Sequence, residues 1–384
     1  MVPREALIIG AGIGGLCAGI ALQRAGVRVA IYEAAPAPRE VGAGLTLWPN
    51  AIRALDRLGL GAAVRALGTV DRHGGAIADW RGRSLVTLPA AALEARFGAP
   101  IVVVHRAEFG ALLAEALGRD APRYDARLQS FAPDDGGRIV AHFADGHVAR
   151  GDLLIGADGL RAVTRQQLFG GPAPRYAGYT AWRAVVPYDQ ARIPLWGEFW
   201  GRGLRFGLAP IGGDRVYYFA TRNAPAGSDR RGTPESRRTE LLRLFGGWAD
   251  PVPDLLAATD PAALLQNDIE ELPPLPRWGA GPVTLLGDAA HAMTPNLGQG
   301  ACLAIEDAVT LAACLHETTD VAGALRRYEA RRRPRATRLQ RQARLIGRVG
   351  QWSHPLACAL RDRGIGLVPT GLRLRAFDSI LGGE

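Results

Sequence analysis

Four glycines near the start of the chain have the spacing of a phosphate-binding turn. Gly10, Gly12, Gly14 and Gly15 follow the apolar run 6–10 and open an apolar segment with helical character. In this pattern Gly10 permits a tight turn, Gly12 lets the backbone approach a pyrophosphate, and Gly15 allows close packing of helix and strand. The unpaired N–H groups at the start of the helix favour a phosphate there. The turn therefore predicts a bound dinucleotide, and the alternative is a glycine-rich turn that serves packing alone.

A carboxylate stands where such a fold binds ribose. Glu33 ends the apolar segment 27–33, which predicts a second strand. A carboxylate at this place accepts a hydrogen bond from a ribose 2′-hydroxyl, whereas a 2′-phosphate would be repelled. Glu33 therefore favours FAD or NAD over NADP as the bound dinucleotide.

A second glycine-rich run lies in the last quarter of the chain. Residues 287–300 read GDAAHAMTPNLGQG, and the apolar strand-like segment before them ends at Asp288. Ligands of open α/β sheets bind at the carboxyl ends of the strands, which is where this carboxylate would lie. Pro295 disfavours helix before it, and Gly298 and Gly300 free the backbone to approach a flat ligand.

A helix over 301–315 follows this run, and its first turns carry no basic residue. The positive end of its dipole would stabilise the negative charge of a reduced flavin. His291 lies inside the run and is interpreted as structural rather than as a catalytic base. The alternative for the whole run is a loop whose glycines serve turn geometry alone.

The elements around these residues follow a nucleotide-binding pattern that is interrupted and then resumed. A strand, a helix and a strand over 6–33 form a βαβ unit, and 138–159 predicts a hairpin turning at Asp145–Gly146, followed by a buried strand. From 176 to 275, aromatic residues and arginines alternate as in a largely antiparallel sheet. A buried strand and a helical region complete the chain.

The composition excludes several classes of protein. The chain has 384 residues and a net charge of +9, and all 46 of its basic residues are arginine. The absence of lysine excludes Schiff-base chemistry and a Walker-type phosphate site. The arginines are spread along the chain, so we expect no nucleic-acid partner. The 4 cysteines show neither a pairing pattern nor metal-ligand spacing, and no apolar segment could span a bilayer. We expect a cytoplasmic protein without a metal or a membrane.

The arginine-rich stretch 323–350 predicts a helix that packs along the nucleotide-binding domain and is kinked at Pro334. Apolar residues at helical spacing alternate there with arginines. The alternative for this stretch is a role at a membrane surface.

Three segments together resemble the fingerprints of the class A, single-component FAD-dependent aromatic monooxygenases. They are 10–15, 151–161 (GDLLIGADGLR) and 287–300, in the order and separation of that family. Within the family the chain is most similar to the urate hydroxylase and salicylate hydroxylase group, through the segments 41–51, 176–183 and 245–261.

The resemblance implies an α/β (α+β) fold with a Rossmann-like FAD-binding domain, an inserted, mostly antiparallel β-sheet domain for the substrate, and C-terminal helices. We place the FAD-binding domain at 1–70, 101–175 and 278–384, and the substrate-binding sheet domain at 71–100 and 176–277. A monomer or a homodimer is expected.

The resemblance also implies the reaction. FAD reduced by NADH or NADPH would react with O₂, and the resulting C4a-hydroperoxyflavin would hydroxylate a small aromatic or heteroaromatic substrate. Two alternatives are a flavin-dependent reductase or oxidase on the same fold, without oxygen insertion, and a flavoprotein without turnover.

Cofactor contacts are carried over from the family by position. Asp158 belongs to the motif that the family uses near FAD and NAD(P)H, and Arg161 beside it could simply be its salt-bridge partner. The residues expected to hold FAD are Gly10, Gly12, Gly14, Gly15, Glu33, Ala34, Thr46, Arg106, Leu128, Asp158, Asp288, Gly298, Gln299, Gly300, Ala301 and Cys302.

On the substrate side the resemblance points to Arg205 and Tyr217, on two strands joined by a short turn, and to Pro295 against the flavin. We expect Arg205 and Tyr217 to face one another across the hairpin, with the arginine binding an anionic or carbonyl oxygen and the tyrosine binding the ring. The alternative is a structural arginine packed on an aromatic ring. Ala181 and Arg183 depart from the urate hydroxylase pattern, so the sequence does not single out urate.

Overall fold

The computed structural model describes residues 5–38, 43–72, 74–193, 196–228 and 232–382. A five-stranded sheet in the order β17-β18-β11-β1-β2 organises the first part of the fold. It is parallel except for the edge strand β17. The strands are β1 (Glu5–Ile9), β2 (Arg28–Tyr32), β11 (Leu153–Gly156), β17 (Gly279–Ala280) and β18 (Val283–Leu285).

Alternate residues of these strands enter two different cores. Ala6 and Ile8 of β1 pack with the helices α1 (Ile13–Arg24) and α10 (Gly300–His316). Leu7 and Ile9 pack instead with a three-stranded sheet of β8 (Leu128–Pro133), β9 (Ile139–Phe143) and β10 (Val148–Gly151). The sheet is therefore covered on both faces, as the continuous apolar strands require. The predicted hairpin is confirmed: Gly146 has φ +82° and its N–H donates to the carbonyl of Phe143 over 3.0 Å.

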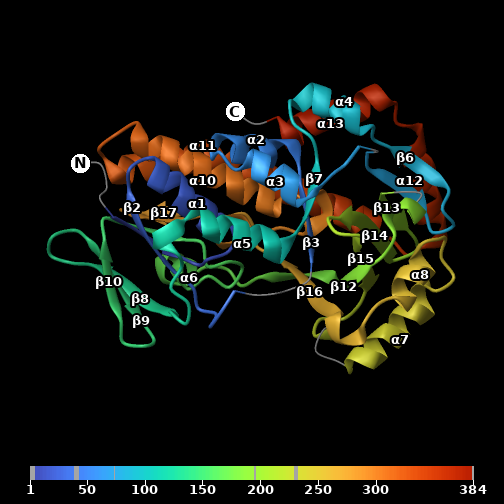
Figure 1. The fold of residues 1–384 in the computed structure, drawn as a ribbon, viewed down its shortest axis with the longest axis horizontal. Helices are drawn as coiled ribbons and strands as arrows, with labels where there is room; N and C mark the ends of the chain where they lie inside the picture. Colours follow the sequence, from blue (N-terminus) through green and yellow to red (C-terminus); the bar gives the residue numbers. More distant parts are fainter. Residues whose placement is uncertain (1–4, 39–42, 73, 194–195, 229–231, 383–384) are drawn as a thin grey trace.

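A seven-stranded sheet in the order β16-β12-β15-β14-β13-β5-β6 forms the second part (Figure 1). Its neighbours are antiparallel except for β13 and β5. One face, with Trp182, Phe206 and Tyr218, packs against α7 (Pro234–Phe245) and α8 (Val252–Ala257). The strands are β5 (Ala76–Asp79), β6 (Ser84–Thr87), β12 (Arg175–Pro187), β13 (Gly197–Trp200), β14 (Leu204–Ile211), β15 (Arg215–Asn223) and β16 (Leu265–Glu271).

The opposite face of this sheet meets the first part of the fold. We call it the inner face; it carries Arg183, Arg205 and Tyr217, because successive side chains of a strand alternate. A Cβ atom at Gly350 would lie 3.1 Å from Cδ of Arg205, and one at Gly44 would lie 2.4 Å from Cγ of Tyr217. The inner face therefore touches the region that carries the predicted cofactor residues.

The remaining elements complete the layers. β3, β7 and β4 form a third small sheet, in the order β3-β7-β4. Their bounds and those of the other helices are β3 (Gly44–Leu47), β4 (Thr69–Val70), β7 (Val102–His105), α2 (Pro49–Arg57), α3 (Gly61–Leu67), α4 (Ala90–Phe97), α5 (Arg106–Ala116), α6 (Val163–Phe169), α9 (Asp288–His291), η5 (Pro295–Leu297), α11 (Val321–Gly350), α12 (Pro355–Leu367) and α13 (Thr370–Leu381).

The predicted fold class is confirmed by this arrangement, while the exact division into two domains stays a prediction. The arginine-rich stretch lies within α11, a single helix of 30 residues that continues on both sides of Pro334. Within the ranges that the structure describes, no helix is long and apolar enough to cross a membrane.

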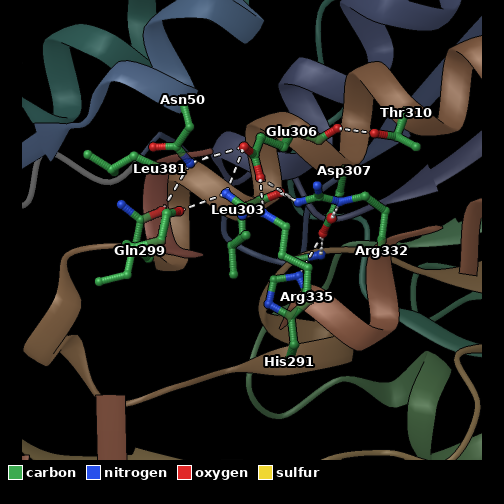
Figure 2. A network of polar contacts seen from close by, with 12 residues as sticks. Asn50, His291, Gln299, Leu303, Glu306, Asp307, Thr310, Arg332, Arg335 and Leu381 are labelled. Carbon is green, nitrogen blue, oxygen red and sulfur yellow. Dashed lines mark hydrogen bonds and ion pairs between the residues drawn. The ribbon is translucent and has the colours of Figure 1, made fainter. Parts of the chain in front are cut away.

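Arg332 of α11 is buried in a network of ion pairs, which the sequence analysis did not anticipate (Figure 2). Its Nε lies 2.7 Å from Asp307 and its Nη2 lies 2.8 Å from Glu306, both on α10. A hydrogen bond of 2.6 Å joins His291 Nε2 to Asp307, and this histidine is only 1% exposed. The interpretation of His291 as a structural residue agrees with this contact. Arg335 adds a second cation beside Glu306.

Replacing Arg332 by methionine removes a cation that two buried carboxylates share. We expect Arg332→Met to lower the free energy of unfolding by about 3–5 kcal/mol, because breaking a buried ion pair leaves uncompensated charge. Urea denaturation of the holoenzyme measures the change.

Arg341→Met is the matched control, since Arg341 lies exposed on the same helix and should change stability by less than about 0.5 kcal/mol.

Burial alone would raise the pKa of Glu306 and Asp307, but the neighbouring positive charges outweigh it and hold both pKa values low. The network therefore stabilises fully above the ordinary carboxyl pKa, and its contribution is lost as the pH falls through the lowered values. Wild-type stability of Arg332→Met at neutral pH would contradict this account.

Candidate active site

The glycine turn between β1 and α1 has the geometry that a bound diphosphate needs. Gly10 has φ +105°, and a Cβ atom there would lie 2.3 Å from the carbonyl oxygen of Ala157. A Cβ atom at Gly15 would lie 1.9 Å from the carbonyl oxygen of Gly10. Gly12 differs, because a Cβ atom there would meet no described atom within 4 Å. Packing thus requires Gly10 and Gly15, while Gly12 borders the space in front of the helix start, where a diphosphate fits.

Glu33 lies directly beside this turn. Its carboxylate accepts hydrogen bonds from the backbone N–H groups of Ala11, over 2.8 Å, and Ala35, over 2.9 Å. Each carboxylate oxygen keeps a lone pair, so the group can still accept from a ribose hydroxyl. Ala34 is partly buried next to it. The backbone of Ala126 donates to the Glu33 carbonyl, which brings the start of β8, and with it Leu128, to the same end of the turn.

A second group of predicted cofactor residues gathers around β3. Thr46 of β3 pairs with Val103, and its carbonyl oxygen lies 3.7 Å from the sulfur of Cys302 at the start of α10. Arg106 opens α5, its backbone N–H donates to the carbonyl of Ala43, and its side chain is exposed.

Burial raises the pKa of the Cys302 thiol to about 12, so this cysteine is not a nucleophile.

The run from Gly287 to Gly300 forms a short helix, a 3₁₀ turn and the start of α10. Gly298 has φ +62°, and a Cβ atom at Gly300 would lie 3.9 Å from a carboxylate oxygen of Asp288. In the described part of the chain no side chain caps α10, so its first N–H groups are available to an anionic or carbonyl edge of a ligand. Ala301 lies partly buried in this first turn.

Gln299 ties this helix start to α2 (Figure 2). Its Oε1 accepts a hydrogen bond of 3.0 Å from Asn50, which also donates to Glu306 over 3.1 Å. Gln299 is 1% exposed, and its Nε2 has no partner among the described residues. A buried donor of this kind normally has an acceptor, and a flavin carbonyl would supply one.

Asp158 is hydrogen-bonded to Thr164 rather than paired with Arg161. Its Oδ2 accepts from the backbone N–H of Thr164 over 3.0 Å and from its hydroxyl over 3.1 Å. Arg161 pairs instead with Glu270 over 2.7 Å, so the suggestion that it pairs with Asp158 is wrong. Asp158 is hydrogen-bonded to its near neighbour Thr164 at the start of α6. Arg161 is paired with Glu270, which comes from β16. Burial raises the pKa of Asp158.

Arg205 and Tyr217 share the inner face of the sheet but do not face one another. The register pairs Arg205 with Thr221 and Tyr217 with Ala209. The expected juxtaposition is therefore wrong, because the turn between β14 and β15 sets Ile211 opposite Arg215 and every other pair follows from that.

Arg205 is 2% exposed and is held by one side chain of the neighbouring strand β13 and by two from distant segments. Its Nε donates to Gln351 over 2.9 Å, its Nη2 to Asn296 over 2.6 Å, and its Nη1 to Glu198 over 3.4 Å. Its guanidinium carbon lies 5.8 Å from the ring centre of Tyr179. The Arg205 guanidinium thus holds Asn296, the residue after Pro295. Pro295 itself is exposed.

Tyr217 occupies the other end of the inner face. Its ring lies against Gly44 of β3, and the Arg183 guanidinium lies close enough to its hydroxyl to act on its pKa. Burial raises the pKa of Tyr217, while Arg183 and Arg106 act to lower it. Sequence reasoning noticed Arg183 as a departure from a family pattern but did not place it in the site. Glu198, Asn296 and Gln351 were missed, because no local motif marks them.

Comparison with known proteins identifies the family of the chain. A family model described as FAD binding domain matches residues 4–184 and 275–343. The chain is 43% identical over 358 residues to the aurachin C monooxygenase/isomerase of Stigmatella aurantiaca, covering 93% of this chain and 92% of that protein. It is 40% identical over 346 residues to an FAD-dependent urate hydroxylase of Klebsiella pneumoniae, covering 88% of each.

Solved structures extend the likeness to the fold. HpxO of Klebsiella pneumoniae, complexed with FAD and uric acid, superposes with a TM-score of 0.92 at 35% identity, over 99% of this chain and 97% of that one. A salicylate hydroxylase substrate complex shares the fold, with a TM-score of 0.76 at 22% identity over 97% and 98% of the two chains. The chain thus belongs to the FAD-dependent aromatic monooxygenases, the class A flavoprotein hydroxylases.

Proposed function

We propose that this FAD-dependent monooxygenase hydroxylates a small aromatic or heteroaromatic compound held at the inner face of the seven-stranded sheet, with NADH or NADPH as reductant and O₂ as co-substrate. The observation that carries the proposal is the meeting of that face with the cofactor loop: Tyr179 and Arg205 both contact Asn296, the residue after Pro295. A ligand at this place would lie next to the start of α10.

The residues of the chain would divide the work between cofactor and substrate. Bound FAD supplies the oxygen chemistry. The glycine turn and Glu33 would hold its diphosphate and ribose, Arg106 and Asp288 its central part, and the uncapped start of α10 the edge of its ring. The sixteen positions predicted from the sequence stay proposals for this role.

Arg205 would serve both as a positioning residue and as a substrate contact. A guanidinium has five N–H groups, of which the observed bonds use three. The remaining N–H groups could reach a substrate oxygen, Tyr217 could hydrogen-bond the ring, and Pro295 would limit where the ring lies. The names of two relatives point to aurachin C and to urate, so relatives of this similarity do not share one substrate.

The test is a screen of aromatic acids, phenols and purines with the purified holoenzyme. The expected result is NAD(P)H oxidation that a substrate stimulates, with O₂ consumed and a product that has gained one oxygen atom. Stimulated NAD(P)H use without O₂ incorporation would assign the chain to flavin reductases instead.

Gly12→Val should abolish FAD binding while leaving the chain folded. The valine meets no described protein atom at its Cβ, so it projects into the proposed diphosphate path, and its cost to the helix cap is only about 1 kcal/mol. Flavin absorbance per protein and circular dichroism measure the two properties. Gly364→Val, the same change at an exposed glycine of α12, should keep full flavin. A folded Gly12→Val protein with stoichiometric FAD would refute the assignment.

Arg205→Ala should lower both stability and substrate affinity. It leaves Asn296 and Gln351 without their donor, which costs about 1–3 kcal/mol when the groups stay buried.

Tyr217→Phe removes a single hydroxyl and should raise KM without changing flavin content. Melting temperature, flavin content and KM are measured on each variant. An unchanged melting temperature for Arg205→Ala would show that these contacts contribute nothing to stability.

A further inference from the structure

We propose that Arg183 makes this site select aromatic substrates that carry an anionic oxygen, either a carboxylate or an ionised ring hydroxyl. The inference rests on the proposed function and deepens it by naming the substrate class. It assigns the role to a residue other than Arg205, on the grounds of sheet register and charge.

The register places Arg183 in a row of residues across the inner face, between Leu265 of β16 and Phe219 of β15. Arg183 pairs with Phe219, Phe219 with Gly207, and Gly207 with Glu198. A Cβ atom at Gly207 would lie 2.2 Å from the ring of Phe219, so this ring extends over the glycine. The row therefore offers an aromatic surface flanked by a cation on one side and a carboxylate on the other.

Each neighbouring row places a small residue beside this surface, and Arg205 and Tyr217 lie farther along those rows. Ala181 precedes Arg183 on the same face of β12, and Ala209 of β14 pairs with Tyr217. An aromatic ring can stack on Phe219 there in an offset or tilted arrangement, which aromatic pairs prefer. A substituent of that ring would then point toward the Arg183–Tyr217 end or toward the Glu198–Arg205 end.

Charge distinguishes the two ends. Arg205 has a carboxylate partner in Glu198, and three of its N–H groups are in use. Arg183 is only partly buried, it lies near the hydroxyl of Tyr217, and in the ranges that the structure describes no carboxylate forms an ion pair with it. Arg106, the other cation near Tyr217, is the residue proposed for FAD, whose phosphates would balance it. Arg183 therefore brings an unbalanced positive charge to the inner face.

An anionic oxygen on the substrate would supply the missing charge. Arg183 could donate two N–H groups to a carboxylate, or one to an ionised ring hydroxyl, in a charge-assisted hydrogen bond. An ionised hydroxyl also makes the ring richer in electrons, which favours its hydroxylation. A neutral ring would leave the guanidinium desolvated and unpaired, at a cost in affinity.

The experiment titrates the holoenzyme with benzoate and with its neutral counterpart benzamide, and follows binding through the flavin absorbance. Wild-type enzyme should prefer benzoate by about 10- to 150-fold, the range of one charge-assisted hydrogen bond. Arg183→Gln should abolish the preference with full FAD content, and Arg183→Lys should restore part of it. With 4-cyanophenol, affinity that rises as the pH passes the pKa of the phenol in wild type, but not in Arg183→Gln, identifies binding of an ionised hydroxyl.

Arg222→Gln is the matched control, because Arg222 lies on the opposite face of the same sheet and pairs with Glu240. It should keep the wild-type preference for benzoate. Equal affinity for the two probes in wild type, no spectral response to benzoate, or a retained preference in Arg183→Gln overturns the inference. If the same enzyme still couples NAD(P)H oxidation to oxygen insertion, the proposed function stands; if it does not, both fail.

Discussion

The buried ion pairs of Arg332 with Glu306 and Asp307 are the contact on which the cofactor end of the molecule depends. They join α11 to α10 in a region from which water is excluded, where charges tolerate little displacement from their partners. Glu306 also accepts from Asn50 of α2, and Asn50 donates to Gln299 just before α10. The network thereby fixes where α10 begins, and this start is the part of the helix that faces the flavin in the proposed site.

The second constraint is the alternation of side chains in the seven-stranded sheet. Trp182 and Tyr218 enter the core under α7 and α8, whereas their neighbours Arg183 and Tyr217 point to the inner face. The large apolar core residues and the residues proposed to contact substrate thus lie on opposite faces of the same strands. A shift of one residue in register would exchange the two sets, so the short turn between β14 and β15 also determines which polar groups point to the proposed substrate site.

Local sequence patterns predicted the features that depend on local backbone geometry. The glycine turn, the βαβ unit and the hairpin at Gly146 follow from backbone conformation and period, and the structure contains all three. Contacts set by register or by distant segments were not predictable. Arg205 lies opposite Thr221 rather than Tyr217, and Arg161 pairs with Glu270, 109 residues away. Arg332 belongs to a run of arginines with no local sign that one of them is buried.

These arginines show that one residue type takes three roles according to its partners. Arg332 is paired with two carboxylates and is 3% exposed, which makes it a structural residue. Arg205 has one carboxylate and two amide acceptors, so it can hold the loop at Pro295 and still offer N–H groups to a ligand. Arg183 lies near the hydroxyl of Tyr217, and among the described residues no carboxylate forms an ion pair with it. In a chain without lysine, the number of acceptors around each guanidinium therefore distinguishes a structural arginine from one that can still bind a ligand, and this difference is the reason for proposing Arg183 as the anion-binding residue.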